Sequence, residues 1–320
     1  MSRFLRTFLF SLVCFSLFAI GGITAYFKIF DSEVTIPQDQ VDKLDLSDKD
    51  PFERAILESK RVNGILLGVN EGMTDTIMFC SLDTENKKMD IISIPRDTFY
   101  HRKGYNGAAD KKINAAYSSQ GIDAVLGGVQ NLLGDKVPIH HYGIIDYKGV
   151  EKIVDLVGGV EVDVPINMRY DDPYDKPPLR IRISKGRQVL DGKKAMEFLR
   201  FRQNNDKTGY PDMDLGRVKA QQQFMTAFLK KAIGLKLPNI IKTGFKYIET
   251  DVNISDGLSY GSKVIGIGSE DMNATTLPGE PRYIGSTSYF IHDPDETEKL
   301  IKQLYGVSEV DETQTEDDDI

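Results

Sequence analysis

The feature that most constrains this sequence is an uninterrupted apolar segment near its start. Residues 7–27 form a run of 21 positions without a charged side chain. As a helix rising about 1.5 Å per residue, this run is about 31 Å long, which matches the ~30 Å hydrocarbon core of a bilayer. Arg3 and Arg6 precede the run and Lys28 follows it. This distribution of positive charge favours an N-terminus that stays in the cytoplasm.

The alternative for this segment is a cleaved signal peptide. The apolar region of a signal peptide usually has only ~7–15 residues. Residues 19–21 (AIG) form a poor cleavage site. We therefore expect residues 1–6 to be cytoplasmic, residues 7–27 to be a retained transmembrane signal anchor, and everything after them to lie outside the cytoplasm.

The rest of the chain divides into a linker, a domain and a tail. Residues 28–60 are polar and acid-rich and are predicted to form a linker. From residue 61 to 305, short apolar strand patterns alternate with helical ones, which predicts one layered α/β domain. Within it, Asp191 and Asp214 are expected to cap helices, and Gly121 to interrupt one. Residues 306–320 form an acidic tail that is expected to be disordered.

Charge and cysteine content exclude two classes of protein. The net charge is −8, but residues 309–320 hold seven carboxylates and no lysine or arginine, so the remainder is near neutral. Binding of nucleic acid through bulk positive charge is therefore not expected. The two cysteines, Cys14 and Cys80, are too few for a scaffold built on disulfides. Cys80 is expected to be a small core residue.

A predicted hairpin brings two carboxylates together. If the turn at residues 84–87 closes an antiparallel hairpin, paired positions sum to about 171, and Asp75 faces Arg96 with Asp97 one step diagonal. Two neighbouring carboxylates repel unless a proton or a cation lies between them. Oxygen ligands without histidine or cysteine suit Mg²⁺ or Mn²⁺ together with substrate phosphates. The equally weighted alternative is that Arg96 bridges both acids as a structural ion pair.

Arginines gather in the second half of the domain. Seven of the fourteen arginines lie between Arg169 and Arg217, and Arg217 falls in the first turn of a predicted helix. The helix dipole disfavours a cation there, unless an anion such as phosphate docks at the helix start. The guanidinium fork also binds phosphate through two hydrogen bonds. The alternative is a surface ion pair between Arg217 and Asp214.

The same predicted helix carries an apolar stripe from Leu215 to Ala232. Such a stripe is typical of a helix that packs on a core. It also has the residue types that a groove for a lipid would need.

Eight short runs occur in an order that resembles the LytR-CpsA-Psr family of bacterial envelope proteins, over roughly residues 62–305. SIPRDT is the most specific of them. The runs are ILLGV at 65–69, TDT at 74–76, SIPRDT at 93–98, KINAAY at 112–117, VDLVGGV at 154–160, LDG at 190–192, RFR at 200–202, and DLGR at 214–217 followed by three glutamines.

The resemblance implies a fold, a location and an activity. The fold is a three-layer α/β/α sandwich with a central mixed sheet, preceded by a transmembrane helix in the bacterial plasma membrane. The activity is a phosphotransfer that moves a glycopolymer phosphate from a polyprenyl-pyrophosphate carrier to a peptidoglycan hydroxyl during cell wall assembly, as in the attachment of teichoic acid or capsule. Hydrolysis of the pyrophosphate is an implied side activity.

The resemblance also implies roles for particular residues. Asp75 and Asp97 match the Mg²⁺ carboxylates, and they are the catalytic candidates together with Arg96 and Arg217. The residues that match the contacts to the pyrophosphate and head group are Lys112, Arg200, Arg202, Asp214, Arg217 and Gln221. An apolar tunnel for the polyprenyl tail is expected near Arg217. Charge neutralisation and alignment, which these residue types supply, are what phosphoryl transfer needs most.

Two departures from the family pattern leave a second function open. Met73 and Ala220 stand where family members carry arginine. With fewer arginines, the domain is alternatively a non-catalytic module that binds polyprenyl phosphates or wall polymer in envelope regulation.

Two further motifs carry less weight. Residues 257–261 satisfy the G-x-S-x-G pattern of α/β-hydrolases around Ser259, with His292 downstream, but the sequence before them is a poor strand. The neighbouring His140 and His141 are expected to point to opposite faces of a strand, which argues against a shared zinc ion.

Overall fold

The computed structural model describes residues 49–175, 178–211, 213–233 and 237–307. The predicted anchor at residues 7–27, most of the predicted linker and nearly all of the predicted tail lie outside these ranges. In the described ranges, no helix combines the length and the apolar character needed to cross a bilayer.

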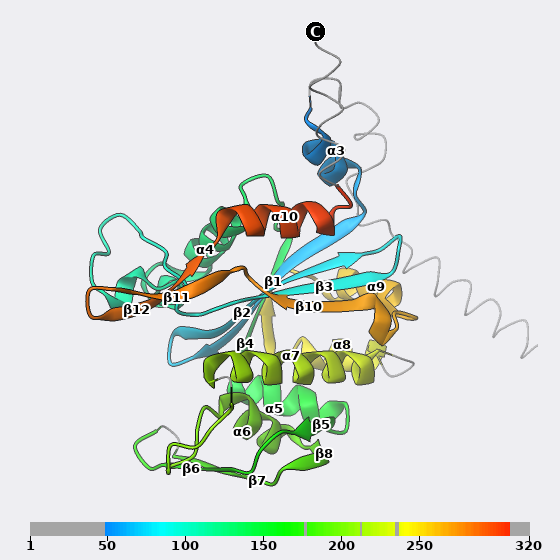
Figure 1. Ribbon diagram of the computed structural model, residues 1–320. Helices are drawn as coiled ribbons and strands as arrows, with labels where there is room; N and C mark the ends of the chain where they lie inside the picture. Colours follow the sequence, from blue (N-terminus) through cyan, green and yellow to red (C-terminus); the bar gives the residue numbers. More distant parts are fainter. Residues whose placement is uncertain (1–48, 176–177, 212, 234–236, 308–320) are drawn as a thin grey trace, which may run out of the picture.

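The described residues form twelve strands and eight α-helices, shown in Figure 1. The strands are β1 (Arg61–Asn70), β2 (Met73–Asp83), β3 (Lys88–Ile94), β4 (His141–Asp146), β5 (Val160–Val164), β6 (Met168–Asp172), β7 (Leu179–Ile183), β8 (Gly186–Leu190), β9 (Ile248–Thr250), β10 (Met272–Thr276), β11 (Gly279–Ile284) and β12 (Thr287–His292). The helices are α3 (Pro51–Glu58), α4 (Asn114–Leu133), α5 (Tyr147–Leu156), α6 (Gly192–Arg200), α7 (Met213–Ala232), α8 (Leu237–Gly244), α9 (Ile254–Val264) and α10 (Pro294–Leu304).

The centre of the fold is a six-stranded sheet in the order β10-β3-β2-β1-β4-β9. The pairs β1–β4 and β10–β3 are parallel, and the other three pairs are antiparallel. The predicted α/β class and central mixed sheet are therefore confirmed. Because β1 and β4 run in parallel, their carboxyl ends meet at one edge of the sheet, where β3 also ends and β2 begins.

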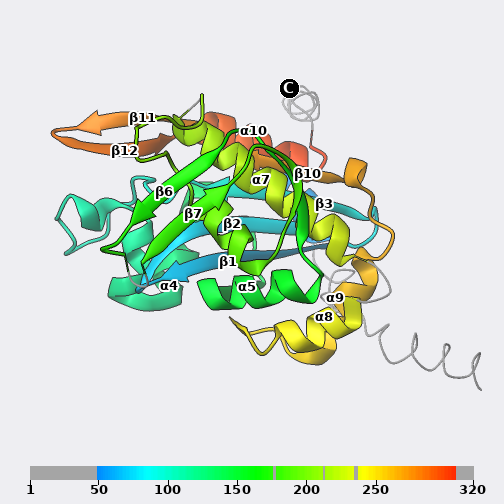
Figure 2. The same cartoon turned by 90° about the horizontal axis from the view of Figure 1, so that it is seen from below.

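Helices cover both faces of the sheet. Helices α4 and α10 lie on one face, and α5, α7 and α8 lie on the other (Figures 1 and 2). Alternate sheet residues such as Ile65, Leu67 and Phe79 are buried against the α4 side, where Val125 and Val129 contribute. The small sheets β5–β8 and β6–β7 add a further layer beyond α6 and α7, which the three-layer prediction did not include.

This outer layer has a core of its own. Buried residues of the small sheets and of α6 and α7 form a second hydrophobic cluster, which includes Val162, Ile181, Phe198 and Phe224. This cluster fixes α6 and α7 relative to each other, and with them the arginines that these helices carry.

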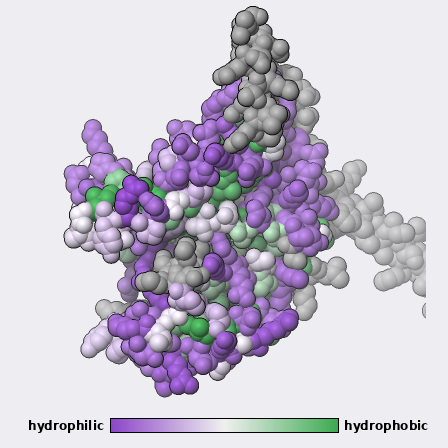
Figure 3. Space-filling model, viewed as in Figure 1, coloured by the Kyte–Doolittle hydropathy of each residue, from purple (hydrophilic) through white to green (hydrophobic). Residues whose placement is uncertain are grey.

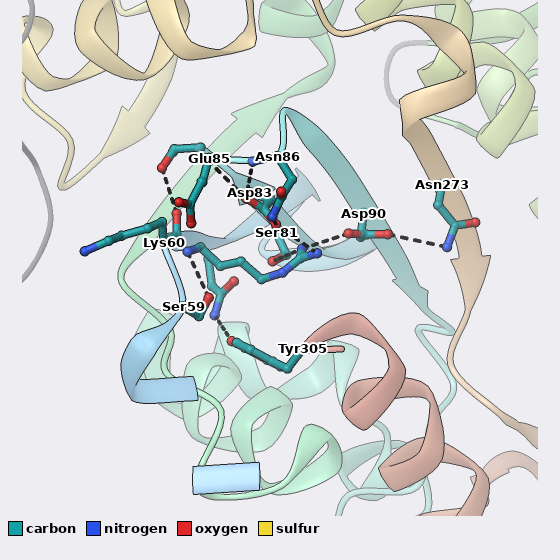
Figure 4. A network of polar contacts seen from close by, with 12 residues as sticks. Ser59, Lys60, Ser81, Asp83, Glu85, Asn86, Asp90, Asn273 and Tyr305 are labelled. Carbon is teal, nitrogen blue, oxygen red and sulfur yellow. Dashed lines mark hydrogen bonds and ion pairs between the residues drawn. The ribbon is translucent and has the colours of Figure 1, made fainter. Parts of the chain in front are cut away.

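The β2–β3 hairpin has the predicted register. The pairs from Ile77↔Ile94 to Asp83↔Lys88 each sum to 171. A polar network that includes Ser81, Asp83 and Asp90 lies at the closed end of the hairpin (Figure 4), and Arg61 contacts all three side chains. Arg61 donates to Asp90 at 2.8 Å and lies 3.6 Å from Asp83, and all three side chains are largely buried. A shift in the register would separate these charges and leave them buried without partners, which is costly, so the network disfavours other registers.

Helix ends follow the predicted signals with one exception. Asp191 caps α6 by accepting a hydrogen bond from the Lys194 backbone, and α4 is interrupted at Gly121, whose φ is 75°. Helix α7, however, begins at Met213. Asp214 therefore lies inside its first turn and not at the predicted cap, and Arg217 is the fifth residue of the helix.

The predicted linker contains a helix. Residues 51–58, predicted as linker, form helix α3, whose N-cap Asp50 accepts from the Glu53 backbone. Phe52 packs edge-on against Tyr305, with ring centres 6.1 Å apart. At the other end of the domain, the strands β10, β11 and β12 precede the last helix, α10.

Candidate active site

Asp75 lies on a β-bulge at the edge where β1, β3 and β4 end. Gly68 pairs with Thr76 and Val69 pairs with Thr74, so Asp75 is the extra residue of β2 between two successive positions of β1. A bulge bends its strand and redirects the side chain of the extra residue, and such bulges are common beside active sites. The bulge accounts for how Asp75 reaches the cavity described below.

Both carboxylate oxygens of Asp75 have partners. Arg96 Nη1 lies 2.5 Å from Oδ1, and the Tyr147 hydroxyl donates to Oδ2 at 2.7 Å. The predicted meeting of Asp75 and Arg96 at the open end of the hairpin is thus confirmed. Arg96 and Asp75 remain about a quarter exposed (26% and 30%), so they face the cavity and not the core.

Asp97 pairs with a different cation. Lys112 Nζ lies 3.1 Å from Asp97 Oδ1. The backbone carbonyl of Asp97 accepts from the Phe290 amide at 2.9 Å, which ties this loop to β12. Among the described contacts, Arg96 pairs with Asp75 alone, so the alternative in which one arginine bridges both acids does not hold.

The end of α6 supplies two arginines. Arg200 is ion-paired with Asp175, and its guanidinium lies 4.6 Å from the centre of the Tyr147 ring. Its side chain is 20% exposed. Arg202 follows just after the helix and is exposed. Through Tyr147, which also contacts Asp75, Arg200 lies close to the open end of the hairpin.

Helix α7 contributes Arg217 and Gln221, which lie one turn apart and line the same space. Gln221 Nε2 donates to the Leu199 carbonyl at 3.3 Å, which joins α7 to the end of α6. Nearby, burial raises the pKa of the Tyr210 hydroxyl to about 12, and the charge of Arg217 acts in the opposite direction. The side chain of Asp214 lies outside the described part of the chain.

Two cavities meet at these residues. The first has a volume of about 750 Å³ and a mixed lining that includes Asp97, Tyr170, Asp172, Lys207 and Tyr289. The second has a volume of about 660 Å³. The residues that line both cavities are Asp75, Thr76, Met78, Arg96, Arg200, Arg202, Arg217 and Gln221. Charged groups therefore mark the junction between the first cavity, which is of mixed polarity and is called the polar cavity below, and the second, which is called the apolar cavity.

The second cavity lies between the sheet and the helices α5, α7 and α8. Its walls are mostly aliphatic and aromatic side chains, such as Leu66, Phe228, Leu229 and Ile241. Cys80 also lines it, and burial raises the pKa of its thiol to about 12. An apolar cavity next to Arg217 is what the tunnel prediction required, whereas Cys80, predicted as a core residue, lies on the cavity wall.

Two carboxylates of the first cavity suit a hard divalent cation. Asp75 and Asp97 offer carboxylate oxygens, and the described residues contain no group of three or more histidine, cysteine or acidic side chains placed to hold a metal. A cation held by two carboxylates needs further oxygens from a substrate, which is how Mg²⁺ commonly binds phosphates. The residues present therefore fit Mg²⁺ as part of a metal–phosphate complex.

Comparisons with known proteins agree on one family. Residues 22–306 match the LytR_cpsA_psr family. The chain belongs to this family. It is 28% identical over 311 residues, 92% of this chain and 76% of the relative, to the polyisoprenyl-teichoic acid–peptidoglycan teichoic acid transferase TagV of Bacillus subtilis (strain 168). It is 34% identical over 220 residues, 66% of each chain, to TagU of Bacillus cereus, which bears the same transferase description.

A solved structure supports the family at the level of the fold. The crystal structure of B. subtilis TagV superposes with a TM-score of 0.64 at 28% identity, and the match covers 78% of this chain and 99% of that one. This LytR_cpsA_psr domain therefore shares the fold of TagV over nearly all of the solved TagV chain.

The two departures from the family pattern lie in different environments. Met73, at the start of β2, is 44% exposed, whereas Ala220 on α7 is 5% exposed and packs in the second hydrophobic cluster with Phe224. Because Met73 is exposed, an arginine at position 73 would fit without movement of core side chains. At position 220, it would have to displace core side chains of this particular chain.

Two residues of the site, Tyr147 and Asp175, were not predicted from the sequence. Tyr147 and Asp175 contact the predicted residues Asp75 and Arg200, yet they lie in segments with no recognised motif. Tyr147 directly follows the strand β4, so its place at the carboxyl end of a strand is the one signal that could have found it.

The two rival motifs do not form sites. Ser259 lies inside helix α9 and is 2% exposed, whereas a hydrolase nucleophile sits on a sharp turn between a strand and a helix. His140 Nδ1 accepts from the Asn63 backbone amide at 2.9 Å, and His141 contacts Asp251 and Tyr260. The two histidines therefore have separate partners, as their positions on a strand predicted.

Proposed function

We propose that this protein is a membrane-anchored, Mg²⁺-dependent phosphotransferase that moves a glycopolymer phosphate from a polyprenyl-pyrophosphate carrier to a peptidoglycan hydroxyl. The observation that supports it most directly is the meeting of an apolar and a polar cavity at a cluster of arginines and carboxylates. A lipid diphosphate has the same division between an apolar chain and a charged head. The transferase names of TagV and TagU support the same class of reaction.

In this proposal, the apolar cavity holds part of the polyprenyl chain, and the junction holds the diphosphate. Arg96, Arg200 and Arg217 lie at the junction, where their guanidinium groups neutralise phosphate charge through paired hydrogen bonds. Arg202, Lys112 and Gln221 are the further head-group contacts that the family resemblance implies. The polar cavity then faces the glycopolymer and the incoming acceptor.

Asp75 and Asp97 are the proposed ligands of Mg²⁺, with Mn²⁺ as a substitute. When bound, the cation would neutralise the diphosphate and polarise the phosphorus that is attacked. Arg96 holds one oxygen of Asp75 and Lys112 holds one oxygen of Asp97, so both carboxylates are oriented by a cationic neighbour.

The reaction exchanges one phosphorus–oxygen bond for another. The acceptor hydroxyl oxygen attacks the phosphorus that carries the glycopolymer, the bond to the bridging oxygen breaks, and polyprenyl monophosphate leaves. A carboxylate of the pair takes the hydroxyl proton. The arginines stabilise the charge that builds on the leaving phosphate, which is the main contribution a protein makes to phosphoryl transfer.

The proposed location follows from the apolar run at residues 7–27, which fits one membrane span with the domain outside the cytoplasm. An anchor of this kind keeps the domain beside a donor that itself stays in the membrane. A fusion reporter at each terminus, assayed for cytoplasmic or extracytoplasmic activity, tests this topology.

The decisive experiment uses the full chain in detergent with a short-chain polyprenyl-pyrophosphate glycopolymer, peptidoglycan fragments and Mg²⁺. The proposal expects release of polyprenyl monophosphate, loss of the product in Arg217→Ala, and no loss in Arg187→Ala. Arg187 is a suitable control because its side chain is 77% exposed and pairs with Glu161 outside both cavities.

Two other outcomes are distinguishable in the same assay. Tight donor binding with no product in the presence of acceptor supports the non-catalytic binding module and contradicts the transferase. Product formed equally fast without acceptor identifies hydrolysis of the pyrophosphate as the main activity.

A further inference from the structure

We infer that Tyr147 is a positioning residue that holds Asp75 and Arg200 in one fixed arrangement at the junction of the two cavities. The inference rests on the proposed function, because it assigns Asp75 to the cation and Arg200 to the diphosphate. Tyr147 belongs to no motif of the chain, and its role follows from its contacts.

The backbone holds Tyr147 firmly in place. Strand β4 ends at Asp146, and Tyr147 is the first residue of α5. The Asp146 side chain caps this helix by accepting from the Gly149 amide at 2.7 Å. Because β4 pairs in parallel with β1, with Asp146 opposite Val69, the start of α5 lies beside the bulge that carries Asp75.

The hydroxyl of Tyr147 fixes the carboxylate. It donates to Asp75 Oδ2 at 2.7 Å, while Arg96 holds Oδ1 at 2.5 Å. A carboxylate with a donor on each oxygen cannot rotate freely about its terminal bond, so its remaining lone pairs keep a defined direction. Partners of this kind orient the ligands of a metal and tune its affinity.

The ring of Tyr147 supports the guanidinium of Arg200. The guanidinium carbon lies 4.6 Å from the ring centre, a distance typical of a cation–π contact. Asp175 holds the same guanidinium by an ion pair. The hydroxyl of Tyr147 therefore holds the Asp75 carboxylate, and its ring supports the Arg200 guanidinium.

Two substitutions separate the hydroxyl from the ring. Tyr147→Phe removes the hydrogen bond to Asp75 and keeps the ring under Arg200, whereas Tyr147→Leu removes both. The first variant is expected to affect the cation alone, and the second to affect the cation and the diphosphate. Tyr260→Phe is the matched control, since it removes a 2.8 Å contact between Tyr260 of α9 and His141, neither of which lines either cavity.

The experiment uses the full chain in detergent and measures both binding and turnover. Mn²⁺ affinity is measured by electron paramagnetic resonance with inorganic pyrophosphate present, and pyrophosphate affinity by calorimetry without metal. For Tyr147→Phe we expect Mn²⁺ affinity to fall about tenfold, and the Mg²⁺ concentration needed for half-maximal transfer to rise about tenfold. Pyrophosphate affinity and the KM for the donor should each change less than about twofold. For Tyr147→Leu we expect donor KM to rise as well.

Other outcomes overturn the inference. If Tyr147→Phe retains the Mn²⁺ affinity of the parent, the hydroxyl does not position Asp75. If the Phe and Leu variants lose metal and pyrophosphate affinity equally, Tyr147 has only a packing role. Neither result contradicts the proposed function if the parent protein transfers phosphate. If the parent protein shows no turnover, the proposed function is contradicted. The Mn²⁺ and pyrophosphate binding measurements then still test the role of Tyr147.

Discussion

Asp75 and Arg96 form a 2.5 Å ion pair at the open end of the β2–β3 hairpin, 21 residues apart in the chain. At the closed end of the same hairpin, Arg61 pairs with Asp90 at 2.8 Å. The two pairs differ in exposure, since Arg96 is 26% exposed and Arg61 only 8%. The pair that faces the cavity is available to a ligand, and the shielded pair maintains the strand register.

This difference predicts opposite effects of two similar substitutions. Asp75→Asn keeps the shape and removes the charge, so we expect transfer to fall at least about 100-fold with little change in stability. Asp90→Asn removes the charge that pairs with the buried Arg61 guanidinium. It should therefore lower the free energy of unfolding by about 1–3 kcal/mol. Turnover per folded molecule should not change. Steady-state kinetics and urea unfolding of both variants make the comparison, and a large loss of turnover in Asp90→Asn would contradict it.

The ion pair between Asp175 and Arg200 predicts competition with the substrate. The Asp175 carboxylate holds the guanidinium that the proposal assigns to the diphosphate, so a phosphate must replace it. Partly exposed pairs contribute about 0.2–1 kcal/mol, so Asp175→Asn should tighten binding of inorganic pyrophosphate by up to about fivefold. Calorimetry measures this effect.

The control for this measurement is Asp171→Asn. Asp171 also pairs with arginines, Arg180 and Arg182, but it does not line either cavity. Its substitution should leave pyrophosphate affinity unchanged. Weaker binding by Asp175→Asn would show that Asp175 supports Arg200 for its ligand and does not compete with it.

The apolar cavity predicts discrimination by chain length. Leu229 on α7 lines it, and a larger side chain there reduces the space between α7 and the sheet. We expect Leu229→Trp to lower kcat/KM for a long polyprenyl donor more than tenfold while a donor of two isoprene units is affected less than about threefold. Leu229→Met, which nearly conserves volume, should behave as the parent. An equal loss with both donors would place the lipid chain elsewhere.

The hairpin and its ion pair were predictable from the sequence because both depend on local rules. A four-residue turn between two alternating strands fixes the register, and the register fixes which side chains face each other. The prediction that Asp75 meets Arg96 needed nothing more. The meeting of this hairpin with Arg217, more than a hundred residues later, was predicted only through the family resemblance.

The bulge at Asp75 and the contacts of Tyr147 and Asp175 were not predictable in this way. The bulge concerns the pairing of β2 with β1, and the turn that sets the β2–β3 register does not control it. Tyr147 and Asp175 reach the site through the packing of α5 and through the segment after β6. No motif marks either residue, and the position of Tyr147 after β4 indicates the end of the sheet but not its two contacts. Tertiary packing decides such positions, and single-sequence patterns do not encode it.

The last prediction concerns stability and pH. His140 Nδ1 accepts a hydrogen bond from the Asn63 backbone amide at 2.9 Å, which requires the unprotonated nitrogen. His140 is an exposed residue, but partial desolvation of its ring, and then the neighbouring His141, lowers its pKa below the ordinary value of about 6.5. Below pH ~6.5 the unfolded chain therefore binds a proton at this position that the folded chain does not, so stability falls as pH decreases.

His140→Asn tests this assignment, because the asparagine oxygen can accept the same hydrogen bond and does not titrate. We expect the parent to lose more stability than the variant between pH 7.5 and 5.5, measured from urea unfolding midpoints. Burial also lowers the pKa of His292, but His292 is present in both proteins, so its contribution cancels in the difference. If both proteins lose the same stability over this range, His140 does not contribute to the pH dependence, and other groups account for it.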